Sequence, residues 1–138
     1  MWPFSFGSGT NYCQEMREIL KNYMLQYIKD NPSSGDAVIP IFSDAEVMIR
    51  RSSEKQLCKM MKKNHVNAEC GVLNILQNFA MVKLSPQPAL EYLLDDNPVL
   101  ELYDAINELK LQKGYISQRQ YEENKMLGVK LSLQSPFR

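Results

Sequence analysis

The sequence has few of the residues from which structural metal sites and disulfide frameworks are built. Its 138 residues include one histidine and three cysteines. The cysteines, Cys13, Cys58 and Cys70, are odd in number and far apart, with no C-x-x-C pair. An odd and scattered set argues against a disulfide framework, and a single histidine leaves a zinc site short of ligands. We therefore expect reduced thiols and no bound metal.

Long apolar runs and net charge are also missing. No apolar stretch approaches the roughly 20 residues needed to span a bilayer, and the N-terminus lacks the basic and apolar regions of a secretory signal. The 16 basic and 16 acidic residues cancel, so no overall field attracts nucleic acid or an anionic membrane. These absences predict a soluble, intracellular protein, with the cytoplasm as the expected compartment.

The motifs of common enzyme classes are absent as well. The chain contains neither G-x-x-x-x-G-K-[ST] nor G-x-S-x-G. His65 could activate Cys58 or Cys70 if the fold brought them together, but a lone histidine flanked by asparagines is typical of a loop. Acidic residues of the C-terminal half fit the solvated faces of helices: Glu91, Asp95, Asp96, Glu101, Asp104 and Glu108. We therefore predict a protein that is not an enzyme and uses no cofactor.

What the sequence does contain is helical periodicity. Apolar residues make up 44% and charged residues 23% of the chain, as in ordinary globular domains. The pattern predicts an all-α fold, a small bundle of five to seven helices forming one domain over residues 11–128. Residues 68–83 are apolar on nearly all sides and are expected at its centre. Extended arms at 1–10 and 129–138 flank the domain. A likeness of residues 73–80 to an armadillo repeat leaves an armadillo-like helical stack as the alternative.

The N-terminal half predicts one long helix followed by a less regular region. Apolar residues recur at helical spacing over 11–29. Residues 37–42, AVIPIF, predict an edge strand or an extended segment, because Pro40 disfavours a central strand. A capping box that begins at Ser43 then predicts the start of a second helix.

A break in that second helix is expected close to Ser53. The string S-E-K-Q at 53–56 is a further capping box, which would begin a new helix running to Lys63. A loop with His65 would follow at 64–67. After the central helix, Ser85 predicts an N-cap with Pro86 at the first position of a short helix. Ala89, Leu90, Leu93 and Leu94 would form its buried side.

The most detailed local prediction is a pair of helices joined by a tight turn within residues 100–127. Gly114 stands where the first helix needs a residue that tolerates positive φ. Ser117 and Gln120 form a capping box for the second helix, and Ile116 and Tyr121 occupy the positions of a hydrophobic staple. A fourth signal is the helical spacing of the apolar residues Leu102, Tyr103, Ile106 and Leu109, and all four predict the same corner.

This hairpin resembles the short C-terminal helical hairpins of the SHOCT type over residues 97–128. The shared residues are Asn97 and Pro98 at the start, and then Gly114, Ile116, Ser117, Tyr121, Glu122 and Lys125. In that family the unit is an oligomerisation or interaction appendage on otherwise unrelated proteins. The resemblance therefore implies an interaction role and no catalytic activity.

Apolar residues at the two ends of the chain predict partner-binding surfaces. Trp2, Phe4 and Phe6 alternate before a Gly-Ser-Gly hinge at 7–9, and aromatic side chains dominate interface hot spots. Residues 129–134 alternate between apolar and polar, which is typical of an extended segment. We expect a non-catalytic interaction or assembly subunit that binds a protein partner or a second copy. The partner-binding residues would be Trp2, Phe4, Phe6, Tyr121 and Leu131.

A cluster of basic residues supports an alternative function. Within 50–63 the only acid is Glu54, and the basic residues are Arg50, Arg51, Lys55, Lys59, Lys62 and Lys63. On a continuous helix, the residues at 51, 55, 59 and 63 would form one stripe able to follow a phosphate backbone. The alternative is therefore a nucleic-acid-binding accessory protein that uses this stripe. No aromatic residue interleaves with it, which favours a solvated face or a protein contact.

Overall fold

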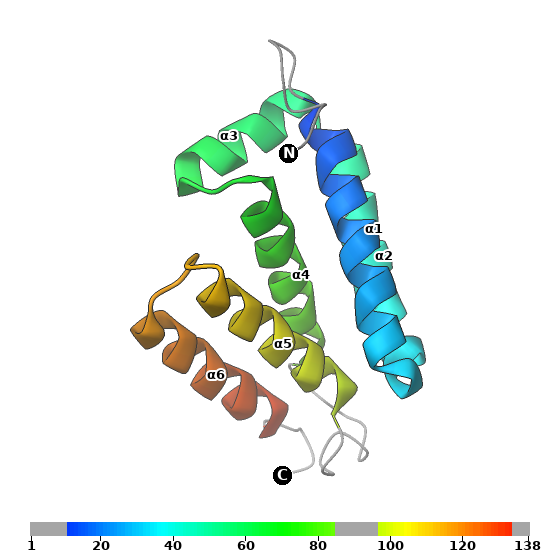
Figure 1. The fold of residues 1–138 in the computed structure, drawn as a ribbon, viewed down its shortest axis with the longest axis vertical. Coiled ribbons are helices and arrows are strands. Elements are labelled where there is room, and N and C mark those ends of the chain that lie inside the picture. Colours follow the sequence, from blue (N-terminus) through cyan, green and yellow to red (C-terminus); the bar gives the residue numbers. More distant parts are fainter. Residues whose placement is uncertain (1–10, 85–96, 134–138) are drawn as a thin grey trace.

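The computed structural model describes residues 11–84 and 97–133, and these ranges contain six α-helices, one short 3-10 helix and no strand. The elements are α1 (Tyr12–Asp30), η2 (Pro32–Ser34), α2 (Gly35–Arg51), α3 (Glu54–Asn64), α4 (Ala68–Leu84), α5 (Pro98–Gln112) and α6 (Gln118–Leu133). Helix α4 lies in the middle, with α1 and α2 on one side and the α5–α6 hairpin on the other (Figure 1). The predicted all-α bundle is confirmed. The arm over 1–10, the cap at Ser85 and the short helix predicted to follow it fall outside the described residues.

Helix α1 begins where two side chains satisfy its free N–H groups. The Asn11 side chain accepts from the backbone N–H of Gln14 at 3.0 Å, which is an ordinary N-cap. The Glu54 carboxylate, from the first turn of α3, accepts from the backbone N–H groups of Tyr12 at 2.7 Å and Cys13 at 2.9 Å. Negative charge at a helix N-terminus also complements the helix dipole. The one acid among the basic residues at 50–63 therefore joins α3 to α1.

Residues 37–42 are helical, so the predicted edge strand and the predicted cap at Ser43 are both wrong. Helix α2 starts at Gly35 and continues through Pro40 and Ser43 to Arg51. Its buried residues recur at helical spacing across the proline: Val38, Ile41, Phe42, Ala45 and Ile49. Pro40 itself faces solvent. Burying five apolar side chains outweighs the local cost of the backbone hydrogen bond that a proline removes.

The break after α2 is confirmed. Ser53 and Gln56 form both halves of a capping box, with the Ser53 hydroxyl accepting from Gln56 N at 3.1 Å and the Gln56 side chain accepting from Ser53 N at 2.9 Å. Helix α3 then ends at His65, which caps it in the left-handed conformation with φ of 53°. The role of the exposed His65 is therefore structural: its left-handed conformation ends α3 and lets the chain turn toward α4.

Helix α4 provides the centre of the core, as its apolar composition predicts. It packs against α1, α2 and α5, and Val72, Leu73 and Leu76 have essentially no exposed surface. Helix α5 starts at Pro98, where the Asn97 side chain accepts from Val99 N and Leu100 N at 3.1 Å. Proline is favoured there because its missing N–H would have had no helical partner.

The corner between α5 and α6 is confirmed at two of its signals. Gly114 has φ of 75°, and the Ser117 hydroxyl accepts from Gln120 N at 3.1 Å. The Gln120 side chain instead donates to Asn124 at 2.9 Å, so the second half of this capping box is not formed. The local sequence therefore fixes the turn through backbone conformation and one cap.

The predicted extended tail is wrong for residues 129–133, because α6 continues to Leu133. Gly128 and Ser132, four residues apart, lie on the buried face of this helix. A Cβ atom on Gly128 would stand 2.7 Å from the Tyr103 ring, so α6 approaches α5 at a distance that only glycine allows. The alternation of Val129, Leu131 and Leu133 is therefore a coincidence of helix packing: Leu131 packs against the core, whereas Val129 and Leu133 are exposed.

Candidate interaction surfaces

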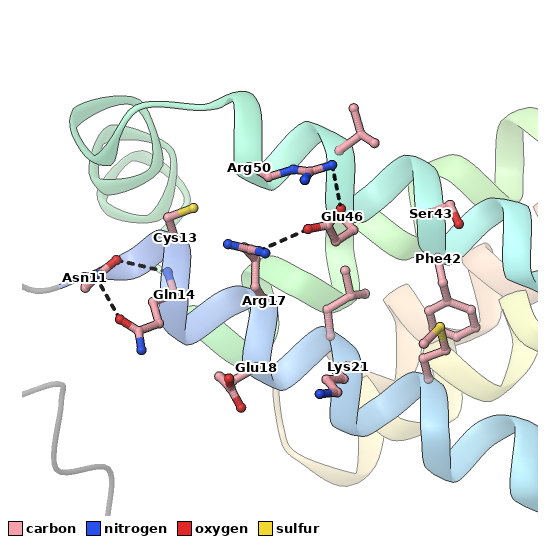
Figure 2. Close-up of a pocket in the computed structure, with 13 residues that line it drawn as sticks. Asn11, Cys13, Gln14, Arg17, Glu18, Lys21, Phe42, Ser43, Glu46 and Arg50 are labelled. Atoms are coloured by element: carbon pink, nitrogen blue, oxygen red, sulfur yellow. Dashed lines mark hydrogen bonds and ion pairs between the residues drawn. The ribbon is translucent and has the colours of Figure 1, made fainter.

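A cleft of about 960 Å³ lies between α1 and α2. Figure 2 shows Arg17 of α1 and Arg50 of α2 meeting at Glu46, with distances of 3.1 and 3.2 Å to its carboxylate. Both arginines are largely exposed, and such surface ion pairs contribute little free energy. One carboxylate thus pairs both guanidinium groups, and the rest of the cleft has a mixed polar and apolar lining.

A second groove, about 640 Å³, is bordered by α3 and α6 and has α4 along its floor. Its apolar lining includes Met48, Met60, Ile75, Phe79 and Val82, and its polar lining consists largely of side-chain amides. Lys110 of α5 is the only charged residue among those that line it. We refer to this feature as the α4 groove.

Lys110 is unusual because its ammonium group is buried beside a neutral partner. Only 6% of the residue is exposed, and Nζ donates to Gln77 Oε1 at 2.7 Å. Burial lowers the pKa of Lys110 below its ordinary value, since a low-dielectric site disfavours the charged form. Among the described residues, Gln77 Nε2 is a buried donor with no acceptor. The pair therefore leaves donors unsatisfied at the edge of the α4 groove.

The thiol and imidazole groups do not form a catalytic pair. Cys70 is buried on α4, whereas His65 is exposed at the end of α3, and no hydrogen bond joins them in the described structure. Burial raises the pKa of the Cys70 thiol, which disfavours the nucleophilic thiolate. Cys58 is half-buried on α3 and is also unpaired with His65 in the described residues. Cys70 serves as a small core side chain.

The acidic residues predicted as solvated helix faces divide into three groups. Glu91, Asp95 and Asp96 lie outside the described residues, while Glu101 and Glu108 are exposed on α5. Asp104 is half-buried, and burial raises the pKa of its carboxyl group. Nowhere in 11–84 and 97–133 do three or more His, Cys, Asp or Glu side chains gather as a metal site would require.

Helix α6 carries apolar side chains on the face turned away from the core. Met126, Val129 and Leu133 are 73%, 42% and 50% exposed. Their spacing of three and four residues places them in one row along the helix. We call this row the outer stripe of α6. It was hidden in the sequence by the strand-like alternation of residues 129–134.

Two of the predicted partner-binding residues lie on the inner side of α6. The Tyr121 hydroxyl donates to Glu108 at 3.0 Å, and its backbone carbonyl accepts from Asn107 at 2.9 Å. Leu131 is half-buried and packs against the core. Trp2, Phe4 and Phe6 are not among the described residues. Within α6, the exposed apolar side chains are therefore Leu127, which is 39% exposed, and the three residues of the outer stripe.

The basic residues at 50–63 do not form one continuous stripe. Arg50 and Arg51 end α2, and Ser52 and Ser53 separate them from the lysines of α3. Lys55, Lys59, Lys62 and Lys63 are exposed, opposite the buried Leu57 and Met61. Within the described residues none of these lysines forms an ion pair. The structure therefore has a lysine face on α3 alone, which is shorter than the stripe predicted over residues 50–63.

No family model matches the chain, and no curated protein or solved structure is significantly similar to it. The resemblance to SHOCT hairpins therefore depends on the residues of the hairpin alone. None of the described helices is both long enough and apolar enough to cross a membrane.

Proposed function

We propose that this protein is a non-catalytic assembly subunit that self-associates through the outer stripe of α6. The observation that carries the proposal is the row of Met126, Val129 and Leu133, exposed on a helix whose opposite face is already packed. Contiguous exposed apolar surface marks interaction sites in proteins. Positions three and four residues apart are also the spacing by which two helices pack along a common seam.

The charges beside the outer stripe favour a second copy of this chain in antiparallel orientation. If Met126 packs against Val129 of the second copy, the flanking Glu123 lies next to Lys130 of the second copy, and the converse pair forms by symmetry. Both residues are exposed in the single chain, and among the described residues Glu123 pairs with the exposed Arg119 alone. One surface thus provides an apolar seam and two complementary charge pairs.

The test is the molecular mass of the full chain, measured by sedimentation velocity over a range of concentrations. The unchanged chain is expected to dimerise, and the double variant Met126→Lys/Leu133→Lys is expected to stay monomeric. Leu25→Lys, which changes a 55% exposed leucine on α1, is the matched control and should dimerise normally. A chain that is monomeric at every concentration would contradict the proposal.

Charge exchange tests the orientation separately. Glu123→Lys and Lys130→Glu should each weaken the dimer, because each places like charges together. The double exchange should restore it, since the pairs are then complementary again. If the double exchange does not restore the dimer, the antiparallel arrangement is excluded. The proposal that the outer stripe forms the dimer contact would still stand.

The lysine face of α3 supports a second candidate, nucleic-acid binding. Lys55, Lys59, Lys62 and Lys63 are exposed and unpaired within the described residues. Four phosphate contacts would make affinity fall steeply with salt concentration. Titration of labelled single-stranded and duplex DNA and RNA at several salt concentrations tests this, with Lys55→Glu/Lys59→Glu as the variant. Affinity that is absent, or unaffected by the variant, would exclude this candidate.

A further inference from the structure

The α4 groove is long enough for a short extended peptide. Its floor runs along α4 from Gly71 to Val82, which is roughly 16 Å at the 1.5 Å rise of a helix. An extended chain covers roughly 3.3 Å per residue, so about five residues would fill this length. α3 contributes Met60 and Asn64 to the lining, and α6 contributes Gln120 and Asn124.

The chemistry of the lining suits the main chain and apolar side chains of a peptide. Exposed or half-buried amides line it at Asn64, Asn74, Asn78, Gln120 and Asn124. Each amide carries both donors and acceptors, which are the groups that peptide N–H and C=O require. Between them lie methionine and phenylalanine side chains at 48, 60 and 79. Methionine adapts its shape to varied apolar partners.

Lys110, the one charged residue in the described lining of this groove, has no counter-ion among the described residues. Lys110 is 6% exposed and Gln77 is 8% exposed, and Lys110 forms no ion pair among the described residues. Its ammonium group has three donors, and Gln77 Oε1 is the acceptor that the described structure provides. Buried charges in proteins are ordinarily paired, because an unpaired one loses its hydration without compensation. A carboxylate arriving from outside would supply the missing partner.

We propose that the α4 groove binds an extended segment of a protein partner in which a Glu or Asp carboxylate, flanked by apolar side chains, pairs with Lys110. The unpaired Gln77 Nε2 beside Lys110 is a second donor for the same carboxylate once the Gln77 side chain adjusts. This inference builds on the proposed interaction function but uses a different surface from the outer stripe of α6. The two proposals can therefore fail independently.

Retention of a peptide library by the immobilised full chain tests the proposal. The probe is a mixture of N-acetylated, C-amidated pentapeptides with Glu at the centre and Ala, Leu, Phe or Ser at the four other positions. A second mixture with Gln at the centre is isosteric but uncharged. We expect at least tenfold greater retention of the Glu mixture, measured by mass spectrometry of the eluted peptides. Equal retention of the two mixtures, or no retention of either, would overturn the proposal.

Variants assign the retention to Lys110. Lys110→Met should abolish the preference for Glu, and Lys110→Arg should keep part of it. Lys59→Met removes an exposed lysine from α3 and should change nothing. A preference for Glu that survives in Lys110→Met would overturn the proposal.

The melting temperature separates a lost site from a lost fold. Lys110→Met should melt at the same temperature as the unchanged chain or higher, because it removes an unpaired buried charge at similar volume. If that variant fails to fold, Asn78→Asp provides the same test. It is nearly isosteric at an exposed position that lines the groove, and its negative charge should reduce retention of the Glu mixture severalfold. Unchanged retention in a folded Asn78→Asp protein would contradict the proposal.

Discussion

Helix α4 buries ten of its 17 residues, whereas α6, with 16 residues, buries only Gly128 and Ser132. The two helices attach to the molecule in different ways. α4 is held by apolar side chains on almost every side. α6 is held by close approach at Gly128 and by hydrogen bonds to α5, while Met126, Val129 and Leu133 face outward.

Three of the hydrogen bonds between α5 and α6 involve Asn107 or Asn124. Asn107, which has no exposed surface, donates to the Tyr121 carbonyl at 2.9 Å and accepts from Asn124 at 3.0 Å. The Tyr103 hydroxyl donates to the Asn124 carbonyl at 2.8 Å. These polar contacts position α6 together with Leu131, which packs against the core, and leave Met126, Val129 and Leu133 exposed. Met126, Val129 and Leu133 therefore remain available for a partner. The comparison of α4 with α6 bears on function for this reason.

The largest expected difference between the two helices is in the cost of removing an apolar side chain. Leu76 of α4 is fully buried, so Leu76→Ala should lower the free energy of unfolding by about 2–5 kcal/mol. Met126→Ala on α6 removes a side chain of similar size from an exposed position. It should change the free energy of unfolding by less than about 0.5 kcal/mol. Chemical denaturation of both variants, at concentrations where the chain is monomeric, measures the difference. Similar losses would show that the outer stripe belongs to the core.

The sequence predicted most of α4 and of the hairpin corner because there local and tertiary preferences agree. Residues 68–83 are apolar enough to be buried in any arrangement, and Gly114 and Ser117 have local reasons for their conformation. The sequence-based prediction of secondary structure was wrong at Pro40 and at residues 129–133, which are helical. In both places the decisive contact is distant in sequence: packing of α2 against α1 and α4, and of Gly128 against Tyr103.

The candidate sites were less predictable than the fold. Lys110 belongs to the same buried face of α5 as Tyr103, Ile106 and Asn107, at spacings of three and four residues. A lysine at a buried position of the helical pattern is the signal that could have identified Lys110 as a candidate site residue. A lysine at such a position, however, often extends its long side chain to solvent. The contact between Lys110 and Gln77 depends on the packing of α4 against α5, which no local pattern encodes. The same packing leaves Lys110 without a carboxylate partner among the described residues.

A smaller expected effect concerns the polar contacts that hold α6. Asn107→Ala should lower the free energy of unfolding by about 1–3 kcal/mol, because it leaves the Tyr121 carbonyl and the Asn124 amide without their partner. Asn22→Ala, at an exposed position on α1, is the control for loss of an amide. Hydrogen exchange should show faster exchange in α6 than in α4 for the Asn107 variant. Equal acceleration in both helices would mean that α6 is not an independently attached element.

The smallest expected effect is a pH dependence at the same α5–α6 contact. Burial raises the pKa of Asp104, Lys125 of α6 partly opposes this rise, and Glu108 adds to it. Asp104 Oδ1 is also buried without a hydrogen-bond donor among the described residues. A carboxyl group whose pKa is higher in the folded than in the unfolded chain destabilises the fold when ionised. Stability is therefore lost as pH rises from the unfolded pKa, about 3.8, through the folded one.

Asp104→Asn removes that ionisation and tests its sign. At pH 7 the variant should melt at a slightly higher temperature than the unchanged chain, by less than Asn107→Ala lowers it. The difference should shrink as pH falls below the unfolded pKa, where both chains are neutral at this position. Glu101→Gln removes one negative charge from an exposed position on α5 and controls for net charge. If Asp104→Asn instead melts lower at pH 7, the attraction between Asp104 and Lys125 exceeds the cost of burial, and a charge pair also holds α6 to α5.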